Sequence, residues 1–186
     1  MRRYLSLLVL LIVMAFSGCA FVVYDVAAVA EDERKMGTLV SDEVIEAKIR
    51  EAYLKDDATK LRNISPFCFN RSVYLVGEYE TEQEKEAAIA IAKSVKGVQS
   101  VELYLLPKAN DALCTRTNNR ALSAKVKIKL IRDKDVSALN VQVKSVQCRT
   151  VLLGIVSSQQ EIDKAIADAE ATEGVREVVS FLRYLH

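Results

Sequence analysis

The chain has 186 residues, of which 51% are hydrophobic and 27% are charged, a composition typical of folded globular proteins. Its 26 basic and 25 acidic side chains nearly cancel, which excludes a general electrostatic attraction for nucleic acid. The one histidine is His186, the last residue, so a hydrolase triad or a histidine-bearing metal site lacks its base or its ligand. We therefore expect no enzyme activity, no catalytic residue, no cofactor and no metal site.

Residues 1–18 have the pattern of a secretory signal peptide. Arg2 and Arg3 form a basic start, residues 4–16 are apolar, and small residues stand directly before Cys19, as in the bacterial lipoprotein box. Cleavage before Cys19 and acylation of its side chain would anchor the mature chain to a membrane. Ala20 at the next position resembles the address of outer-membrane lipoproteins, so we expect the periplasmic face of that membrane. The alternative is an uncleaved transmembrane helix, because the apolar run resumes beyond Cys19.

The rest of the chain contains a repeat at a fixed offset. Residues 41–109 laid on residues 118–186 give 16 identical pairs in 69 columns without a gap, including Gly77 with Gly154 and Gly97 with Gly174. Such self-similarity predicts two small modules. We place them at residues 41–107 and 118–186, with a lipidated N-terminus and tether at 19–40 and a linker at 108–117.

Each module has the same predicted order of elements. In the first, Ser41 caps a helix to about residue 57, strands 63–69 and 73–79 form a hairpin, a helix follows, and strand 98–106 ends the unit. Thr81 to Glu84 and Ser158 to Glu161 are capping boxes at equivalent helix starts. The second module ends with strand 175–184. We predict an α+β fold of two α-β-β-α-β units, each a three-stranded mixed sheet with two helices on one face.

One segment gives conflicting signals. Residues 125–130 alternate between lysine and an apolar residue, which taken alone predicts a strand. The equivalent residues 48–53 have helical periodicity, and the repeat requires both modules to share one topology. We therefore predict that the second module also begins with a helix.

Three cysteines remain beside Cys19, namely Cys68, Cys114 and Cys148. An oxidising compartment allows one intramolecular disulfide among them, and the sequence does not rank the three pairings. All three could equally be unpaired apolar residues.

The strongest candidate for a binding surface is a basic stripe on the first helix of the second module. Leu122, Val126 and Leu130 would face the sheet, which leaves two isoleucines without an inward role. Lysines beside exposed isoleucines are typical of helices that lie on anionic membranes. The predicted lipid-binding residues are Arg120, Lys125, Lys127, Ile128, Lys129, Ile131, Arg132 and Lys134.

The same residues have two alternative interpretations. The helix face could be merely solvated, with its isoleucines packed on the first module. Residues 41–107 carry 9 basic and 12 acidic side chains, and residues 118–186 carry 11 and 8. The opposite signs suggest that Lys125, Lys127 and Lys129 could instead dock on three acids of the first module, Glu82, Glu84 and Glu86.

The repeated motifs resemble the BON domain. They are a hairpin ending in Leu75-Val76-Gly77 or Leu152-Leu153-Gly154, an alanine-rich helix, and Gly97-Val98 with Val101 or Gly174-Val175 with Val178. Two such domains behind a lipobox are similar to the dual-BON outer-membrane lipoproteins. The resemblance implies phospholipid binding and support of outer-membrane integrity, without catalysis. A different class of function, an envelope adaptor that binds a protein partner in a secretion or wall-remodelling assembly, is the alternative.

Overall fold

The computed structural model describes residues 33–56 and 63–184, with side chains from Ser41 onward. Residues 35–186 form one compact unit. The predicted signal peptide and the predicted lipidation site at Cys19 lie outside the described residues. Within the described part, no helix combines the length and the apolar character needed to cross a membrane.

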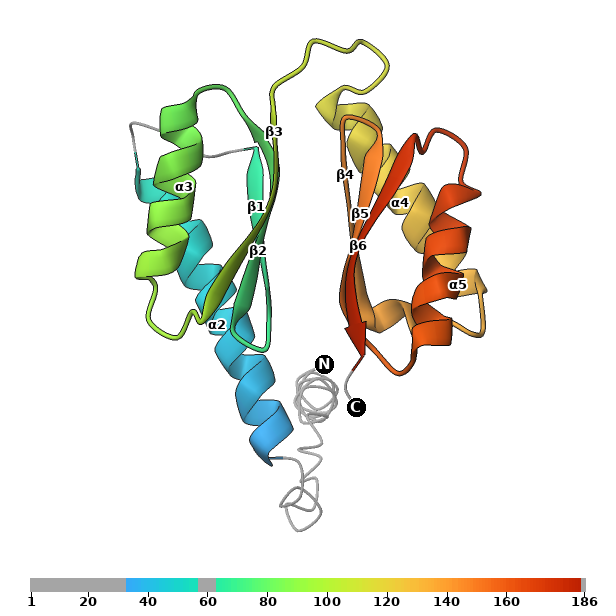
Figure 1. Cartoon of the computed structure of the whole chain (residues 1–186), viewed down its shortest axis with the longest axis horizontal. Coiled ribbons are helices and arrows are strands. Elements are labelled where there is room, and N and C mark those ends of the chain that lie inside the picture. The colour runs from blue at the N-terminus through green and yellow to red at the C-terminus, as the bar shows by residue number, and fades with distance from the viewer. Residues whose placement is uncertain (1–32, 57–62, 185–186) are drawn as a thin grey trace, which may run out of the picture. The chain divides into compact units, whose positions relative to one another are not determined.

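The first module has the predicted α-β-β-α-β order. It consists of α2 (Glu33–Lys55), β1 (Ile64–Phe69), β2 (Ser72–Tyr79), α3 (Glu82–Ser94) and β3 (Ser100–Pro107). β2 lies in the middle of the sheet, antiparallel to β1 and parallel to β3. Both helices cover the same face of this mixed sheet (Figure 1), as predicted.

The second module repeats this topology. It consists of α4 (Arg116–Arg132), the short 3-10 helix η2 (Ala138–Asn140), β4 (Val141–Val146), β5 (Arg149–Val156), α5 (Gln159–Glu170) and β6 (Glu177–Tyr184). β5 is central, antiparallel to β4 and parallel to β6. Residues 125–130 are helical, so the repeat outweighed the local alternation. The buried residues Leu122, Val126 and Leu130 show why, because together they form a stripe at helical spacing.

The start of the first helix differs from the prediction. α2 already begins at Glu33, so Ser41 lies inside the helix and is not its N-cap. Glu33, Arg34, Lys35 and Met36 all favour helix, and the helix continues through Gly37 in spite of the low helix propensity of glycine. The C-terminal part of the predicted tether, from Glu33 onward, is therefore helical.

The predicted capping boxes are present at both second helices. The Thr81 hydroxyl accepts a hydrogen bond from the Glu84 N–H at 3.2 Å, and the Ser158 hydroxyl accepts one from the Glu161 N–H at 3.2 Å. Glu84 in turn accepts from the backbone of Glu80, and Glu161 accepts from that of Ser157. The glutamates thus satisfy further N–H groups at the helix start.

The central strands are buried on both faces. In β2, Val73 and Leu75 pack under the helices, whereas Tyr74 and Val76 pack with Val146, Val151 and Leu153 of the second module. The helix-free faces of the two sheets therefore meet in a shared apolar layer. Continuous apolar runs such as residues 73–76 are the sequence signal for this arrangement.

Polar and aromatic contacts accompany that layer. The Tyr74 and Phe181 rings lie 5.3 Å apart between centroids. The Gln147 side-chain amide donates to Glu78 Oε1 at 2.9 Å and to the Pro107 carbonyl at 2.8 Å. These bonds join the hairpin turn of the second module to the first module.

Candidate functional site

The candidate surface is formed by α4, whose orientation follows from its sequence. Thr115 caps the helix by accepting from the Asn118 N–H at 3.3 Å. Because successive helical residues are about 100° apart, burying Leu122, Val126 and Leu130 directs Ile128 and Ile131 away from the sheet. Their side chains are 49% and 60% exposed. The interpretation in which these isoleucines pack on the first module is therefore wrong.

Four side chains make up what we call the outer face of α4: Lys125, Ile128, Ile131 and Arg132, all exposed. Lys129 is half-buried at the edge of this face. Its charge lies close enough to Asp168 to act on that carboxyl, although the two form no salt bridge. The outer face thus combines two exposed apolar residues with two exposed cations.

Lys127 is held by backbone carbonyls. Its ammonium donates to the carbonyl oxygens of Ala138 and Val141, at the two ends of η2. Burial lowers the pKa of Lys127. The charge therefore clamps η2 to α4, a role that the alternation of lysine and apolar residues did not indicate.

Lys134 lies beyond the helix on which it was predicted. α4 ends at Arg132, and Asp133 terminates it by accepting from the Asp135 N–H at 2.9 Å. Asp133 also pairs with Lys164 on α5 at 3.1 Å. Lys134 is exposed in the turn that follows.

Sequence reasoning missed Leu139, which η2 leaves 90% exposed. η2 is fixed from both sides, because Lys127 binds its carbonyl groups and Glu161 Oε1 accepts from the Ser137 N–H at 2.6 Å. The sequence signal that could have indicated its exposure is a leucine in a short connection, between Ser137 and Asn140. It adds a third exposed apolar side chain beside α4.

The predicted basic residues are not neutralised by neighbouring acids. Among the described residues, none of the six forms a salt bridge with a carboxylate. Docking on the acids of α3 is not observed either, since Glu82 pairs with Lys85 and Glu84 binds the Glu80 backbone. The module-closing interpretation is wrong, because the sheets and not these helices form the contact.

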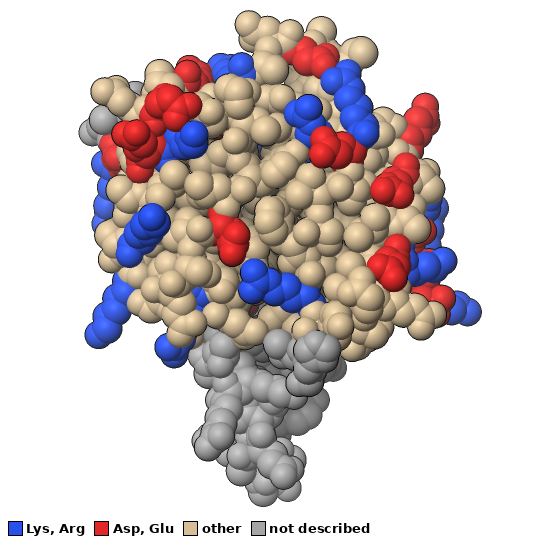
Figure 2. Space-filling model, in the orientation of Figure 1, with Lys and Arg blue, Asp and Glu red and all other residues tan. Residues whose placement is uncertain are grey.

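The equivalent helix of the first module is different. On α2, Arg50 pairs with Glu46, and Lys55 pairs with Glu51 at 2.6 Å. Positions Glu51 and Leu54 correspond to Ile128 and Ile131 at the repeat offset. Two cations of α2 are therefore paired with acids on the same helix, whereas no cation of α4 forms a salt bridge among the described residues. On the face seen in Figure 2, acidic and basic side chains are likewise intermixed.

The cysteines form one disulfide among the described residues. Cys114 and Cys148 are bonded, which ties the linker to the hairpin turn of the second module. Cys68 is a buried free thiol, 3.3 Å from Asp42 Oδ1. Burial, together with the Asp42 charge, raises the pKa of Cys68 to about 12. The described residues contain no group of three or more acidic, cysteine or histidine side chains placed to hold a metal ion.

The BON domain family matches residues 41–105 and 118–185. The chain belongs to this family. It is 35% identical over 163 residues to the outer membrane lipoprotein DolP of Haemophilus influenzae, covering 86% of this chain and 82% of that protein. It is 30% identical over 151 residues to osmotically-inducible protein Y of Escherichia coli, covering 80% and 75%. A solved structure of CdsD from Chlamydia trachomatis is similar with a TM-score of 0.32 and 14% identity, covering 77% of this chain and 63% of that one.

Proposed function

We propose that this BON protein is a lipid-anchored envelope lipoprotein that binds anionic phospholipid through the outer face of α4 and supports outer-membrane integrity. The observation that carries the proposal is the contrast between the two modules. The cations of α4 lack carboxylate partners among the described residues and stand beside exposed isoleucines, whereas two of the cations of α2 are paired. Similarity to a protein named as an outer membrane lipoprotein supports the envelope address.

The energetics suit a weak contact made by a tethered module. Each Lys or Arg near an anionic surface contributes about 1 kcal/mol, and Ile128 and Ile131 can enter the headgroup region. Acylation at Cys19 would hold the module close to the bilayer, so that even a low intrinsic affinity would orient it. Phospholipid would then be bound without any chemical step.

Co-sedimentation with vesicles tests the lipid contact. Residues 20–186 contain the whole compact unit 35–186 and lack Cys19, so no acyl chain holds them to the vesicle. We expect retention on phosphatidylglycerol vesicles and not on phosphatidylcholine vesicles. High salt should reduce the retention, because it screens exposed charges.

Matched variants separate the outer face of α4 from general charge. Lys125→Ala with Ile131→Ser should lose retention, whereas Lys48→Ala with Leu54→Ser at the equivalent positions of α2 should keep it. Equal retention on both vesicle types, or equal loss in both variants, would refute the proposal. Crosslinking that traps one stoichiometric protein partner without lipid preference would favour the adaptor alternative. The mass of the membrane-extracted protein tests cleavage and acylation at Cys19.

A further inference from the structure

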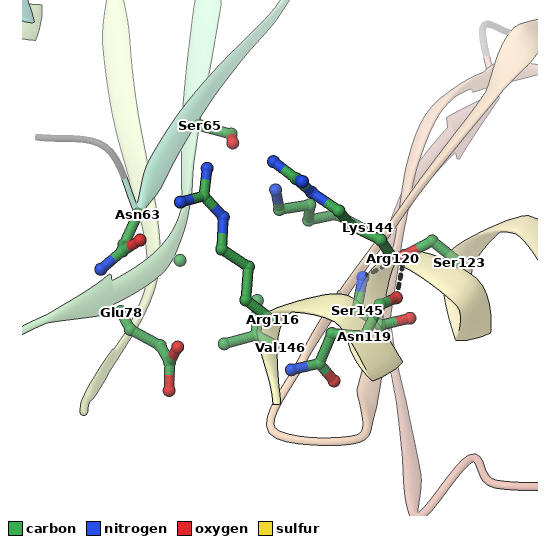
Figure 3. A pocket seen from close by; sticks show the side chains of 11 residues that line it. Asn63, Ser65, Glu78, Arg116, Asn119, Arg120, Ser123, Lys144, Ser145 and Val146 are labelled. Atoms are coloured by element: carbon green, nitrogen blue, oxygen red, sulfur yellow. Dashed lines mark hydrogen bonds between the residues drawn. The ribbon is translucent and has the colours of Figure 1, made fainter. Parts of the chain in front are cut away.

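A polar pocket of about 180 Å³ lies where the first turns of α4 meet both sheets. Three cationic side chains of the second module line it, namely Arg116 and Arg120 from α4 and Lys144 from β4. Figure 3 shows Arg116 reaching toward Asn63 and Ser65 of the first module, with Arg120 and Lys144 extending into the same space. The pocket is thus built by both modules and is separate from Ile128 and Ile131.

The three cations have no carboxylate partner. None of them forms a salt bridge within the described part of the chain. Glu78 lines the same pocket, but its Oε1 accepts from the Gln147 amide at 2.9 Å. The charges around the pocket therefore leave a surplus of two positive charges.

The surroundings of Lys144 disfavour its positive charge. It lies on the face of β4 that is turned toward the first module, next but one to Val146 of the shared apolar layer. Burial lowers the pKa of Lys144, and the charges of Arg116 and Arg120 lower it further. An anion in the pocket would offset both the desolvation and the repulsion.

The fold does not require these cations. At the offset of the repeat, Arg116, Arg120 and Lys144 correspond to Leu39, Glu43 and Phe67 of the first module. The first module therefore attains the same topology with two apolar residues and an acid at these positions. Something other than folding accounts for three basic side chains around one pocket.

We propose that this pocket binds a phosphate monoester group, either on a soluble molecule or on a lipid headgroup. Arginine guanidinium groups bind phosphate oxygens in pairs, and lysine adds a point charge. A monoester carries nearly two negative charges at neutral pH, which matches the surplus around the pocket. A phosphodiester such as phosphatidylglycerol carries one negative charge and is the poorer match.

Calorimetric titration of residues 20–186 with inorganic phosphate tests the pocket, with ionic strength held constant by sodium chloride. We expect saturable binding of one phosphate per chain. Arg116→Gln with Lys144→Met should weaken it about tenfold or more, since both substitutions remove the charge and keep most of the side chain. Lys125→Ala with Lys129→Ala removes two charges from elsewhere on α4 and should leave it unchanged.

The possible results decide both the site and the source of the phosphate. Absence of saturable binding, or equal weakening in both double variants, overturns the proposal. Folding of the variants is checked by circular dichroism, and Arg116→Gln alone, at an exposed position, serves if the double variant unfolds. Binding of glycerol 3-phosphate without preference for phosphatidate vesicles identifies a soluble ligand, and the reverse identifies a headgroup. Arg120 lines the pocket and is also one of the predicted lipid-binding residues. It is left intact in these variants, so that a loss of phosphate binding can be distinguished from a loss of phosphatidylglycerol binding.

Discussion

Asp42 and Asn119 occupy equivalent positions of the repeat, and the side chain of each accepts hydrogen bonds from the hairpin turn of its own module. Asp42 Oδ2 accepts from the Asn70 N–H at 2.6 Å, and its Oδ1 accepts from the Arg71 N–H at 2.7 Å. Asn119 Oδ1 accepts from the Cys148 N–H at 2.9 Å, and residue 148 is equivalent to residue 71. In each module the first helix therefore holds the turn of the hairpin.

These turns need such support, because both of their central residues have positive φ without being glycine. The φ angles are 49° and 61° at Asn70 and Arg71, and 51° and 60° at Gln147 and Cys148. This conformation fits the twist of a two-residue hairpin but is unfavourable for residues with a side chain. Side-chain acceptors on the helices satisfy the turn N–H groups and fix the hairpin.

Removing either acceptor should destabilise the protein. We expect Asp42→Ala or Asn119→Ala to lower the free energy of unfolding by about 1–3 kcal/mol, because turn N–H groups lose their partners. Chemical denaturation monitored by circular dichroism measures this. Glu43→Ala and Thr117→Ala, at exposed neighbouring positions, are the controls, and a loss no larger than theirs would contradict the role.

Gly154 is required because β5 passes close to the backbone at the end of η2, directly before β4. A Cβ atom there would overlap the carbonyl oxygen of Asn140, and φ is +145°. Gly77 has the same relationship to Asn63, so one contact explains why glycine stands at both positions of this repeat pair. We expect Gly154→Ala to lower the free energy of unfolding by more than about 2 kcal/mol, since the backbone of β5 or of Asn140 would have to move. A denaturation midpoint equal to that of the wild type would contradict this reason.

The repeat made the topology predictable from the sequence. Gly97 and Gly174 marked the turns that follow α3 and α5, and the offset showed that residues 125–130 are helical in spite of their alternation. Asp42 illustrates the limit. Its position directly after Ser41 resembled a helix start, yet its carboxylate binds the hairpin turn at Asn70. Local patterns do not show such long-range partners.

The candidate site was only partly predictable for the same reason. Exposure of Ile128 and Ile131 followed from helical periodicity alone. Capture of Lys127 by the carbonyl of Ala138 depends on the path of the chain after α4, which periodicity does not describe. The pocket around Lys144 is lined by residues of both modules, so it could not be predicted without knowing how the two sheets pack against each other.

The Cys114–Cys148 bond should contribute measurably to stability. It closes a loop with a sequence separation of 34, for which reduced chain entropy of the unfolded state gives about 2–4 kcal/mol. We expect Cys114→Ala with Cys148→Ala to lower the unfolding free energy by that amount, and a reductant to have the same effect on the wild type. The stability of the Cys68→Ala variant should still fall on addition of reductant, because this variant retains the Cys114–Cys148 bond. An unchanged denaturation midpoint after complete reduction would contradict this expectation.

Glu161 should make stability depend on pH in the acid range. Burial raises its pKa, but hydrogen bonds from Ser157 and Ser137 outweigh that effect and leave the pKa below its ordinary value. A carboxyl group with a lowered pKa in the folded state stabilises the protein above its unfolded pKa of about 4.3, and this contribution disappears as pH falls through the folded value.

Glu161→Gln should therefore cost about 1–3 kcal/mol at pH 7, because a single amide oxygen cannot replace two carboxylate oxygens that accept from Ser137 and Ser157. The difference from the wild type should stay constant down to about pH 5 and shrink below about pH 4. Urea denaturation across this range measures it, with the exposed Glu173→Gln as control. A difference that grew on acidification would mean that the carboxylate is not the stabilising form. The hydrogen bond from Ser137 to Glu161, which links η2 to α5, would then not explain the stability.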